Sequence, residues 1–187
     1  MVSEISNNTA LSIQTTEKTS TFQQFLRFHL VPDTTALLPV RQMTEVLDIP
    51  VGQIVPIPHM PAWVMGVYNW RGEILWMVDL GHLLGLTPVH QQAKSYLNYT
   101  AIVIHGAQQP VDKMTDKNML GLVVDRVEDM ELCDPDAIQS PPPSAVTSEL
   151  VPFLRGYWLK ANGEILAVLD GKSIVSRMPQ SDTLATP

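Results

Sequence analysis

The feature that most constrains the fold of this chain is an eight-residue sequence that occurs twice. Residues 72–79 read G-E-I-L-W-M-V-D, and residues 163–170 read G-E-I-L-A-V-L-D. Five of the eight positions are identical, and the second copy begins 91 residues after the first. Each copy starts with a turn glycine, continues as an apolar run and ends in aspartate, which is the pattern of a hairpin turn followed by a strand. We therefore expect two equivalent hairpins.

A weaker repeat lies upstream of each copy and in the same order. Residues 38–46 and 122–130 share the pattern L-x-V-x-x-apolar-x-acid-apolar. Gly66 precedes the first octet, and Gly156 precedes the second. Chance similarity between two apolar hairpins is the alternative explanation, but order, spacing and the terminal aspartates favour a duplicated unit.

These repeats define an expected domain organisation. We expect one folded domain over residues 21–178, made of related halves at roughly 22–90 and 96–177. Residues 1–20 are rich in Ser, Thr, Asn and Gln, and such a composition predicts a flexible tail. Residues 179–187 form the second predicted tail.

Short apolar runs separated by proline and glycine fill most of the domain, and this spacing predicts an all-β fold of small barrels or a sandwich. The pattern over residues 42–47 fits a strand and a helical turn equally well. Asn162-Gly163 favours a type I′ turn in the second hairpin. Residues 106–118 are polar and long for a hairpin loop, so we expect them to be mobile.

Charge and cysteine content exclude several classes of protein. The 187-residue chain has a formal net charge of −7, which disfavours nucleic acid as a partner because basic residues dominate that affinity. Cys133 is the only cysteine, so no disulfide can form within the chain, and a cytoplasmic location fits. We find no secretory signal, and no apolar segment approaches the roughly 20 residues that a membrane-spanning helix needs.

Candidate catalytic groups are few. The histidines and the cysteine do not have the spacing of a metal site, and no cofactor-binding or nucleophile motif is present. Asp79 and Asp170 suit paired acid–base catalysis in principle, but their position at the end of each octet favours helix N-caps. Cys133 has acidic neighbours, and these raise a thiol pKa. A small enzyme that uses Asp79, Asp170 or Cys133 is the alternative, and convergence of these side chains in one deep pocket would favour it.

Tryptophans and two charged residues offer an interface instead. Trp63, Trp70 and Trp76 fall within fourteen residues, and aromatic side chains are enriched at interface hot spots, although they also fill cores. We expect Trp76 in the core and Trp70 exposed near the turn. Arg71 and Glu45 are either solvated charges or an ion pair joining the two motifs, and we predict the pair.

Six segments resemble the CheW-like adaptors of bacterial chemosensory systems, over roughly residues 22–178. The segments are 44–47 (T-E-V-L), 57–61 (I-P-H-M-P), 66–72 (G-V-Y-N-W-R-G), 77–80 (M-V-D-L), 120–125 (L-G-L-V-V-D) and 154–156 (L-R-G). The resemblance implies an all-β fold of two intertwined five-stranded SH3-like barrels with short helical turns. It also implies a non-enzymatic adaptor without a cofactor or metal.

The same resemblance implies two partners. These are the regulatory domain of a CheA-like histidine kinase and the cytoplasmic tip of a methyl-accepting receptor, which would associate the adaptor with the membrane without inserting it. The implied partner-binding residues are Met43, Glu45, Val46, Asn69, Trp70, Arg71 and Gly72. The implied structural turns and caps are Gly66, Asp79, Gly156, Gly163 and Asp170.

Two residues depart from the family pattern. Trp70 replaces the usual leucine of the turn, and Trp76 replaces a commonly smaller residue. Such variants resemble those of pilus-driven motility or phototaxis rather than flagellar clusters. A structural array component that binds only kinase domains is the alternative within the same family.

Overall fold

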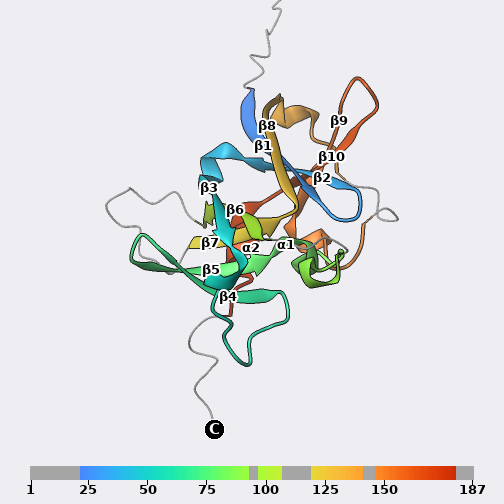
Figure 1. Ribbon diagram of the computed structural model, residues 1–187. Helices are drawn as coiled ribbons and strands as arrows, with labels where there is room; N and C mark the ends of the chain where they lie inside the picture. The colour runs from blue at the N-terminus through green and yellow to red at the C-terminus, as the bar shows by residue number, and fades with distance from the viewer. Residues whose placement is uncertain (1–21, 93–96, 107–118, 141–145, 180–187) are drawn as a thin grey trace, which may run out of the picture.

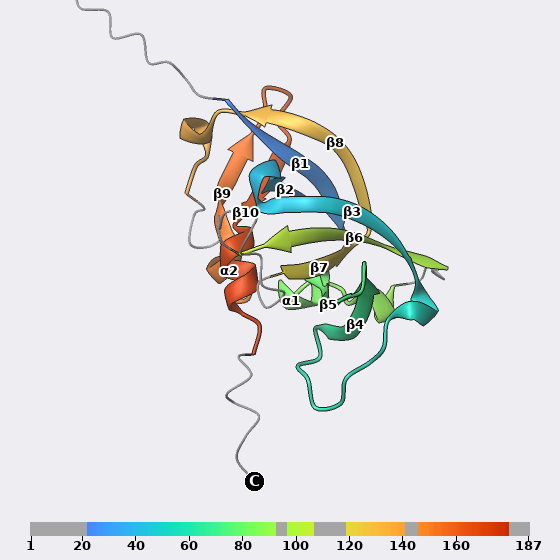
Figure 2. The ribbon, with the colours of Figure 1, turned by 90° about the vertical axis from the view of Figure 1, so that its left-hand side faces the viewer.

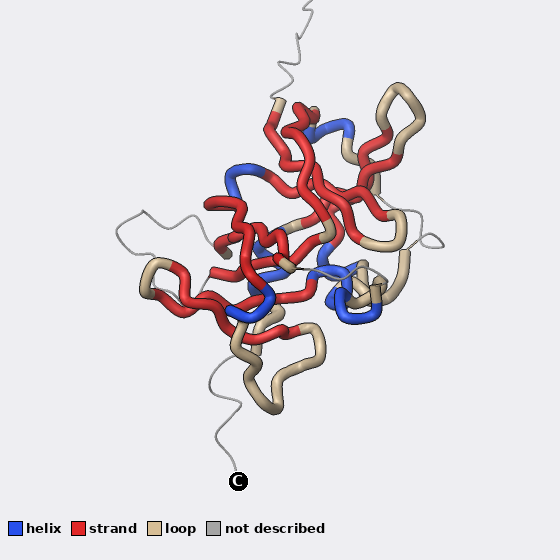
Figure 3. The backbone as a smooth tube through the Cα atoms, viewed as in Figure 1, coloured by secondary structure: helices blue, strands red, loops and turns tan. Residues whose placement is uncertain are grey.

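A computed structural model describes residues 22–92, 97–106, 119–140 and 146–179 (Figure 1). The predicted tail 1–20, most of the predicted tail 179–187 and nearly all of the predicted loop 106–118 lie outside the described residues. Strands dominate the described chain, and the helical segments are short (Figure 3). Among these residues, no helix is long and apolar enough to cross a membrane.

Ten strands carry the fold. They are β1 (Gln23–Leu30), β2 (Thr34–Pro39), β3 (Met43–Pro50), β4 (Val64–Trp70), β5 (Glu73–Asp79), β6 (Asn98–His105), β7 (Met119–Val124), β8 (Arg126–Cys133), β9 (Leu154–Leu159) and β10 (Ile165–Leu169). The α-helices are α1 (Leu80–Leu83) and α2 (Gly171–Ser176). The 3-10 turns are η1 (Val40–Gln42), η2 (Val51–Gln53), η3 (Val89–Gln91), η6 (Pro135–Ala137) and η8 (Val151–Phe153).

The strands form two five-stranded sheets with the same internal order. Sheet A runs β8-β1-β2-β10-β9, and sheet B runs β3-β6-β7-β5-β4. If each strand of the first five is exchanged for the strand five places later in the chain (β1 for β6, β2 for β7 and so on), the order of one sheet becomes the order of the other. The octet strands β5 and β10 then hold the same place in the two sheets, so the predicted equivalence of the hairpins is confirmed. The all-β prediction is confirmed as well.

The two predicted halves are interlocked. The first half gives β1 and β2 to sheet A but β3, β4 and β5 to sheet B. The second half does the reverse. In Figure 2, β1, β2 and β8 of sheet A lie above β4 to β7 of sheet B, and β3, the edge strand of sheet B, lies nearest to them. The sequence pattern over residues 42–47 fitted a strand and a helical turn equally well. In the structure Gln42 is the last residue of the 3-10 turn η1, and the strand β3 begins at Met43.

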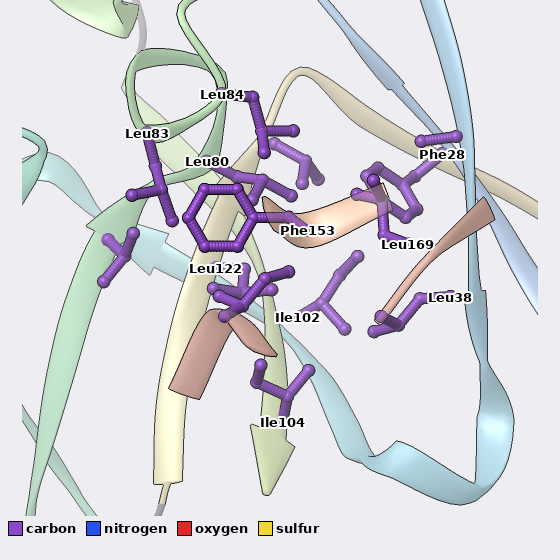
Figure 4. Close-up of a cluster of buried hydrophobic side chains, with 14 of the residues drawn as sticks. Phe28, Leu38, Leu80, Leu83, Leu84, Ile102, Ile104, Leu122, Phe153 and Leu169 are labelled. Carbon is purple, nitrogen blue, oxygen red and sulfur yellow. The ribbon is translucent and has the colours of Figure 1, made fainter. Parts of the chain in front are cut away.

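Alternating apolar side chains build separate cores on the two faces of each sheet. On β6, Ala101 and Val103 pack within sheet B, whereas Ile102 and Ile104 face a cluster shared with sheet A. Successive strand residues point to opposite faces, so an unbroken apolar run is buried on both sides. The shared cluster gathers residues of both sheets, α1 and η8 (Figure 4). It therefore joins the two sheets.

The hairpin turns differ from each other. Arg71 and Gly72 have φ of 55° and 89°, the positive pair that a two-residue type I′ turn requires. In the second hairpin the Gly163 amide donates to the Lys160 carbonyl, the Lys160 amide donates to Glu164, and Gly163 has φ of 86°. Asn162 does not have positive φ. The type I′ prediction at Asn162-Gly163 was therefore wrong, because the strands end earlier and leave a longer loop.

Candidate functional site

The tip of the β4–β5 hairpin presents one cationic side chain. Arg71 occupies the first central position of the turn with φ of 55°, a conformation that residues other than glycine seldom adopt. The Asn69 side-chain oxygen accepts a hydrogen bond from the Gly72 amide at 3.0 Å. This bond steadies the turn, and 67% of the Arg71 side chain remains exposed.

Glu45 of β3 meets this tip from the opposite edge of sheet B. Its Oε2 accepts from Arg71 Nη2 at 2.8 Å, and its Oε1 accepts from Trp70 Nε1. The Arg71 guanidinium also lies 5.0 Å from the centre of the Trp70 ring, within cation–π range. The predicted Arg71–Glu45 ion pair is thus present, and a tryptophan completes it.

Trp70 is half-buried and packs against the core cluster of sheet B. The expectation of an exposed Trp70 was wrong, because β3 passes beside the hairpin tip and covers the indole. Trp76 is also half-buried and packs against the cluster that joins the sheets, so it lies at the edge of the core in which we expected it. Exposed ion pairs contribute only about 0–1 kcal/mol to stability. The pair therefore fixes geometry more than it stabilises the fold.

The remaining predicted binding residues lie on another face. Met43 and Val46 stand opposite Ile104 and Ile102 in the β3–β6 register, and those isoleucines face sheet A. Met43 is half-buried, whereas Val46 is 41% exposed. The structure brings Glu45 together with the turn residues and leaves Met43 and Val46 on the face toward sheet A.

A second cluster, absent from the sequence-based prediction, occupies the equivalent place in sheet A. Lys160 follows β9 and lies 2.6 Å from Glu131 of β8, and it lies 5.8 Å from the Trp158 ring. The Lys160 hydrogen bond lowers the pKa of Glu131 more than burial raises it. The duplication was the signal that could have predicted this cluster, since it implies a cation at the second hairpin and an acid on β8.

Arg27 of β1 extends the second cluster. Its guanidinium pairs with Glu164 at 2.6 Å and with Glu131 at 3.3 Å. Glu128 lies 2.6 Å from Arg27 and from His29. Arg27, Lys160, Glu128, Glu131 and Glu164 thus form a connected network of charges on sheet A.

The predicted caps are confirmed at both octets. Asp79 Oδ1 accepts from the His82 amide at 3.0 Å, and its Oδ2 accepts from the Val89 amide at 2.7 Å. Asp170 Oδ1 accepts from the Lys172 amide at 3.2 Å. Asp79 ends β5 of sheet B, whereas Asp170 directly follows β10 of sheet A. The two carboxylates therefore serve separate helical turns.

Two glycines that we expected at turns lie inside strands instead, Gly66 in β4 and Gly156 in β9. A Cβ atom on Gly66 would lie 2.2 Å from the Val55 carbonyl oxygen, and one on Gly156 would lie 2.5 Å from the Gln139 oxygen. Beside each glycine an isolated bridge joins the preceding segment to the strand, Val55 to Val67 and Gln139 to Tyr157. The absence of a side chain permits these close approaches.

Cys133 is fully buried within the core cluster of sheet A. Burial, followed by the charge of Asp134, raises its pKa to about 11. Cys133 lies in this core, whereas Asp79 and Asp170 cap separate helical turns, so the convergence that would favour an enzyme is not found among these described residues. Within the described ranges, no three His, Cys, Asp or Glu side chains are grouped to hold a metal ion.

Comparison with known proteins identifies the family. The model of the CheW-like domain matches residues 24–178. A probable chemotaxis protein CheW of Rhizobium etli is 34% identical over 101 residues, which cover 54% of this chain and 56% of the relative. The chemotaxis protein CheW of Rhizobium meliloti is 30% identical over 119 residues, which cover 64% of this chain and 67% of the relative.

A solved structure shares the fold. The scaffolding protein TtCheW of Thermoanaerobacter tengcongensis superposes with a TM-score of 0.63 at 23% identity, covering 80% of this chain and 90% of that protein. The matched region spans just over half of the Rhizobium etli relative. The family model covers most of the residues between the predicted tails. This chain belongs to the CheW-like domain family.

Proposed function

We propose that this chain is a non-enzymatic adaptor of bacterial chemosensory signalling, which couples methyl-accepting receptors to a CheA-like histidine kinase. The observation that carries the proposal is the CheW-like match over residues 24–178. Two relatives named as chemotaxis proteins support it, and so does the similar solved structure, which is that of a scaffolding protein.

The geometry of the hairpin tip supports a docking role. Glu45 accepts hydrogen bonds from both Trp70 and Arg71, so the tip is held against β3 before any partner arrives. A preformed surface loses less freedom on binding than a mobile one. The exposed Arg71, with Asn69 and Gly72, would contact the partner, and the half-buried Trp70 would hold Arg71 in place.

Coupling requires that the adaptor contact two kinase states differently. A ligand with equal affinity for both states shifts no equilibrium, whereas differential affinity shifts it by that difference. In this proposal the kinase regulatory domain and the receptor tip occupy different parts of the surface, and Met43 and Val46 belong to a second contact area facing sheet A. The adaptor works in the cytoplasm, beside the membrane that holds the receptors.

Co-purification tests the proposal directly. The full chain carrying a tag should retain the histidine kinase and the receptor encoded beside it, and Arg71→Ala should reduce retention of at least one of them. Arg177→Ala is the matched control, because Arg177 is exposed and lies outside the hairpin cluster. If both variants retain the kinase and the receptor equally well, Arg71 does not belong to the interface.

Binding of the receptor distinguishes the adaptor from a structural array component that binds only kinase domains. A receptor-tip peptide should bind the full chain, whereas an array component that binds only kinase domains would retain the kinase and not the peptide. A role in pilus-driven motility or phototaxis stays a prediction from Trp70 and Trp76. Deletion of the gene followed by separate assays of swimming and surface motility distinguishes it from a flagellar role.

A further inference from the structure

A pocket of about 370 Å³ lies in sheet A, apart from the Glu45–Trp70–Arg71 cluster. It is bounded by the end of β2 with η1, by η8 with the start of β9, and by the end of β10 with α2. The lining residues that carry the argument are Arg41, Gln42, Phe153, Arg155, Asp170 and Lys172. Three segments distant in sequence therefore contribute one cation each.

The cations of the pocket differ from most other described cations because they form no ion pair with a described carboxylate. Eight Lys and Arg residues fall in the described ranges. Arg27, Arg71, Arg126 and Lys160 each form an ion pair with a glutamate. Within the same ranges, Arg41, Arg155, Lys172 and Arg177 form none. Three of these four line the pocket. In a chain of net charge −7, this concentrates uncompensated positive charge at one place.

The one carboxylate in the lining is already engaged. Asp170 accepts hydrogen bonds from the Gln42 side chain at 2.9 Å, from the Lys172 amide and from the Ser173 hydroxyl at 3.1 Å. Gln42 is 6% exposed, and its oxygen accepts from the Gly171 amide at 2.9 Å. Gln42 and Asp170 thus form a fixed floor. Three cations and one carboxylate leave the lining with a net charge of +2.

Size and chemistry together define a ligand. A phosphate monoester is close to a dianion at neutral pH and accepts several hydrogen bonds, which suits a pocket lined by three cations. The volume lies within the range of small-molecule sites and exceeds what an inorganic phosphate ion fills. The remaining lining is largely apolar and includes Pro39, Leu154 and Leu169, which suits an organic group attached to the phosphate.

We propose that this pocket binds a small organic phosphate, with its phosphate group between Arg41, Arg155 and Lys172. Arg41 lies in η1, the connection from β2 of sheet A to β3 of sheet B. A ligand bound there contacts the segment just before Met43 and Glu45. The site therefore lies next to the candidate docking surface without sharing a residue with it.

Titration of the full chain at pH 7.5 and low ionic strength, followed by amide NMR shifts, tests the proposal. The probes are phenyl phosphate and inorganic phosphate, which share the anion and differ in the apolar group. We expect shifts centred on η1, the start of β9 and α2, and about tenfold tighter binding of phenyl phosphate, since its ring buries apolar area. Arg155→Gln should weaken binding about tenfold.

Arg177→Gln is the matched control, because it removes the unpaired cation outside the pocket and should leave affinity within about twofold of the parent. Lys172→Gln repeats the test if Arg155→Gln fails to fold. Equal weakening by Arg177→Gln would show diffuse surface attraction and overturn the site. Equal affinity for the two probes or an absence of shifts at the pocket would also overturn it.

Discussion

The Nη2 atom of Arg71 lies 2.8 Å from the Oε2 atom of Glu45, which ties together the two edge strands of sheet B. In sheet A, Lys160 lies 2.6 Å from Glu131 and links the hairpin after β9 to the edge strand β8. Each hairpin cation also lies over a tryptophan ring, Trp70 or Trp158. The same arrangement thus recurs in both repeats, although the Arg71 side chain is 67% exposed and the Lys160 side chain 24%.

The Arg71–Glu45 pair should affect binding more than stability. Arg71→Ala should change the free energy of unfolding by only about 0–1 kcal/mol, because the guanidinium is solvent-exposed. Charge reversal at either residue should weaken kinase or receptor-tip affinity, and the double reversal should restore part of it. A double-mutant cycle on affinity measures the coupling. Additive effects would show that the pair does not act as a unit in binding.

Gly66→Ala should destabilise the protein. The new Cβ would meet the Val55 carbonyl oxygen at 2.2 Å, and the residue has φ of 140°, so backbone must move. A loss of roughly 1–3 kcal/mol is expected from overpacking. Urea unfolding measures it, with Gly52→Ala as control because nothing lies within 4 Å of that Cβ. Equal effects of both substitutions would contradict the close approach.

The charge network of sheet A should make stability depend on acid pH. The Lys160 hydrogen bond is the main cause that holds the Glu131 pKa below its ordinary 4.5. A depressed pKa gives a contribution that is complete above the unfolded value and disappears as pH falls through the folded value. Melting temperatures should therefore fall more steeply below about pH 4.5 in the parent than in Glu131→Gln. Parallel curves would refute the linkage.

Cys133 should resist modification in the folded protein. Burial raises its pKa to about 11, so little thiolate exists at neutral pH, and the thiolate is the reactive form. Iodoacetamide at pH 7.5 should label the native chain very slowly and the urea-unfolded chain rapidly. Mass spectrometry follows both. Rapid native labelling without unfolding would place the thiol at the surface instead.

Local patterns predicted what local interactions determine. The octets end in aspartates, and an aspartate before a short helical turn satisfies free amides whatever surrounds it. Asp79 and Asp170 could therefore be assigned as caps from sequence. The turn glycines likewise indicated a hairpin, and the repeated octet indicated that the hairpin occurs twice.

Features that depend on distant segments were not predictable in the same way. Trp70 is half-buried because β3, more than twenty residues upstream, crosses beside the turn and supplies Glu45. The turn at Asn162-Gly163 is longer than this dipeptide suggested, because the backbone amide of Lys160 donates to the Glu164 carbonyl across it. The Lys160–Glu131 contact requires knowing that β8 and β9 are opposite edges of one sheet.

The exchange of strands between the halves has a mechanical consequence. The chain passes between the sheets twice, from β2 to β3 through η1 and from β7 to β8 at Asp125. A single covalent connection would let one sheet rotate against the other about that connection. Two connections around a shared apolar cluster restrict this rotation. A force applied to either sheet should therefore move both sheets together.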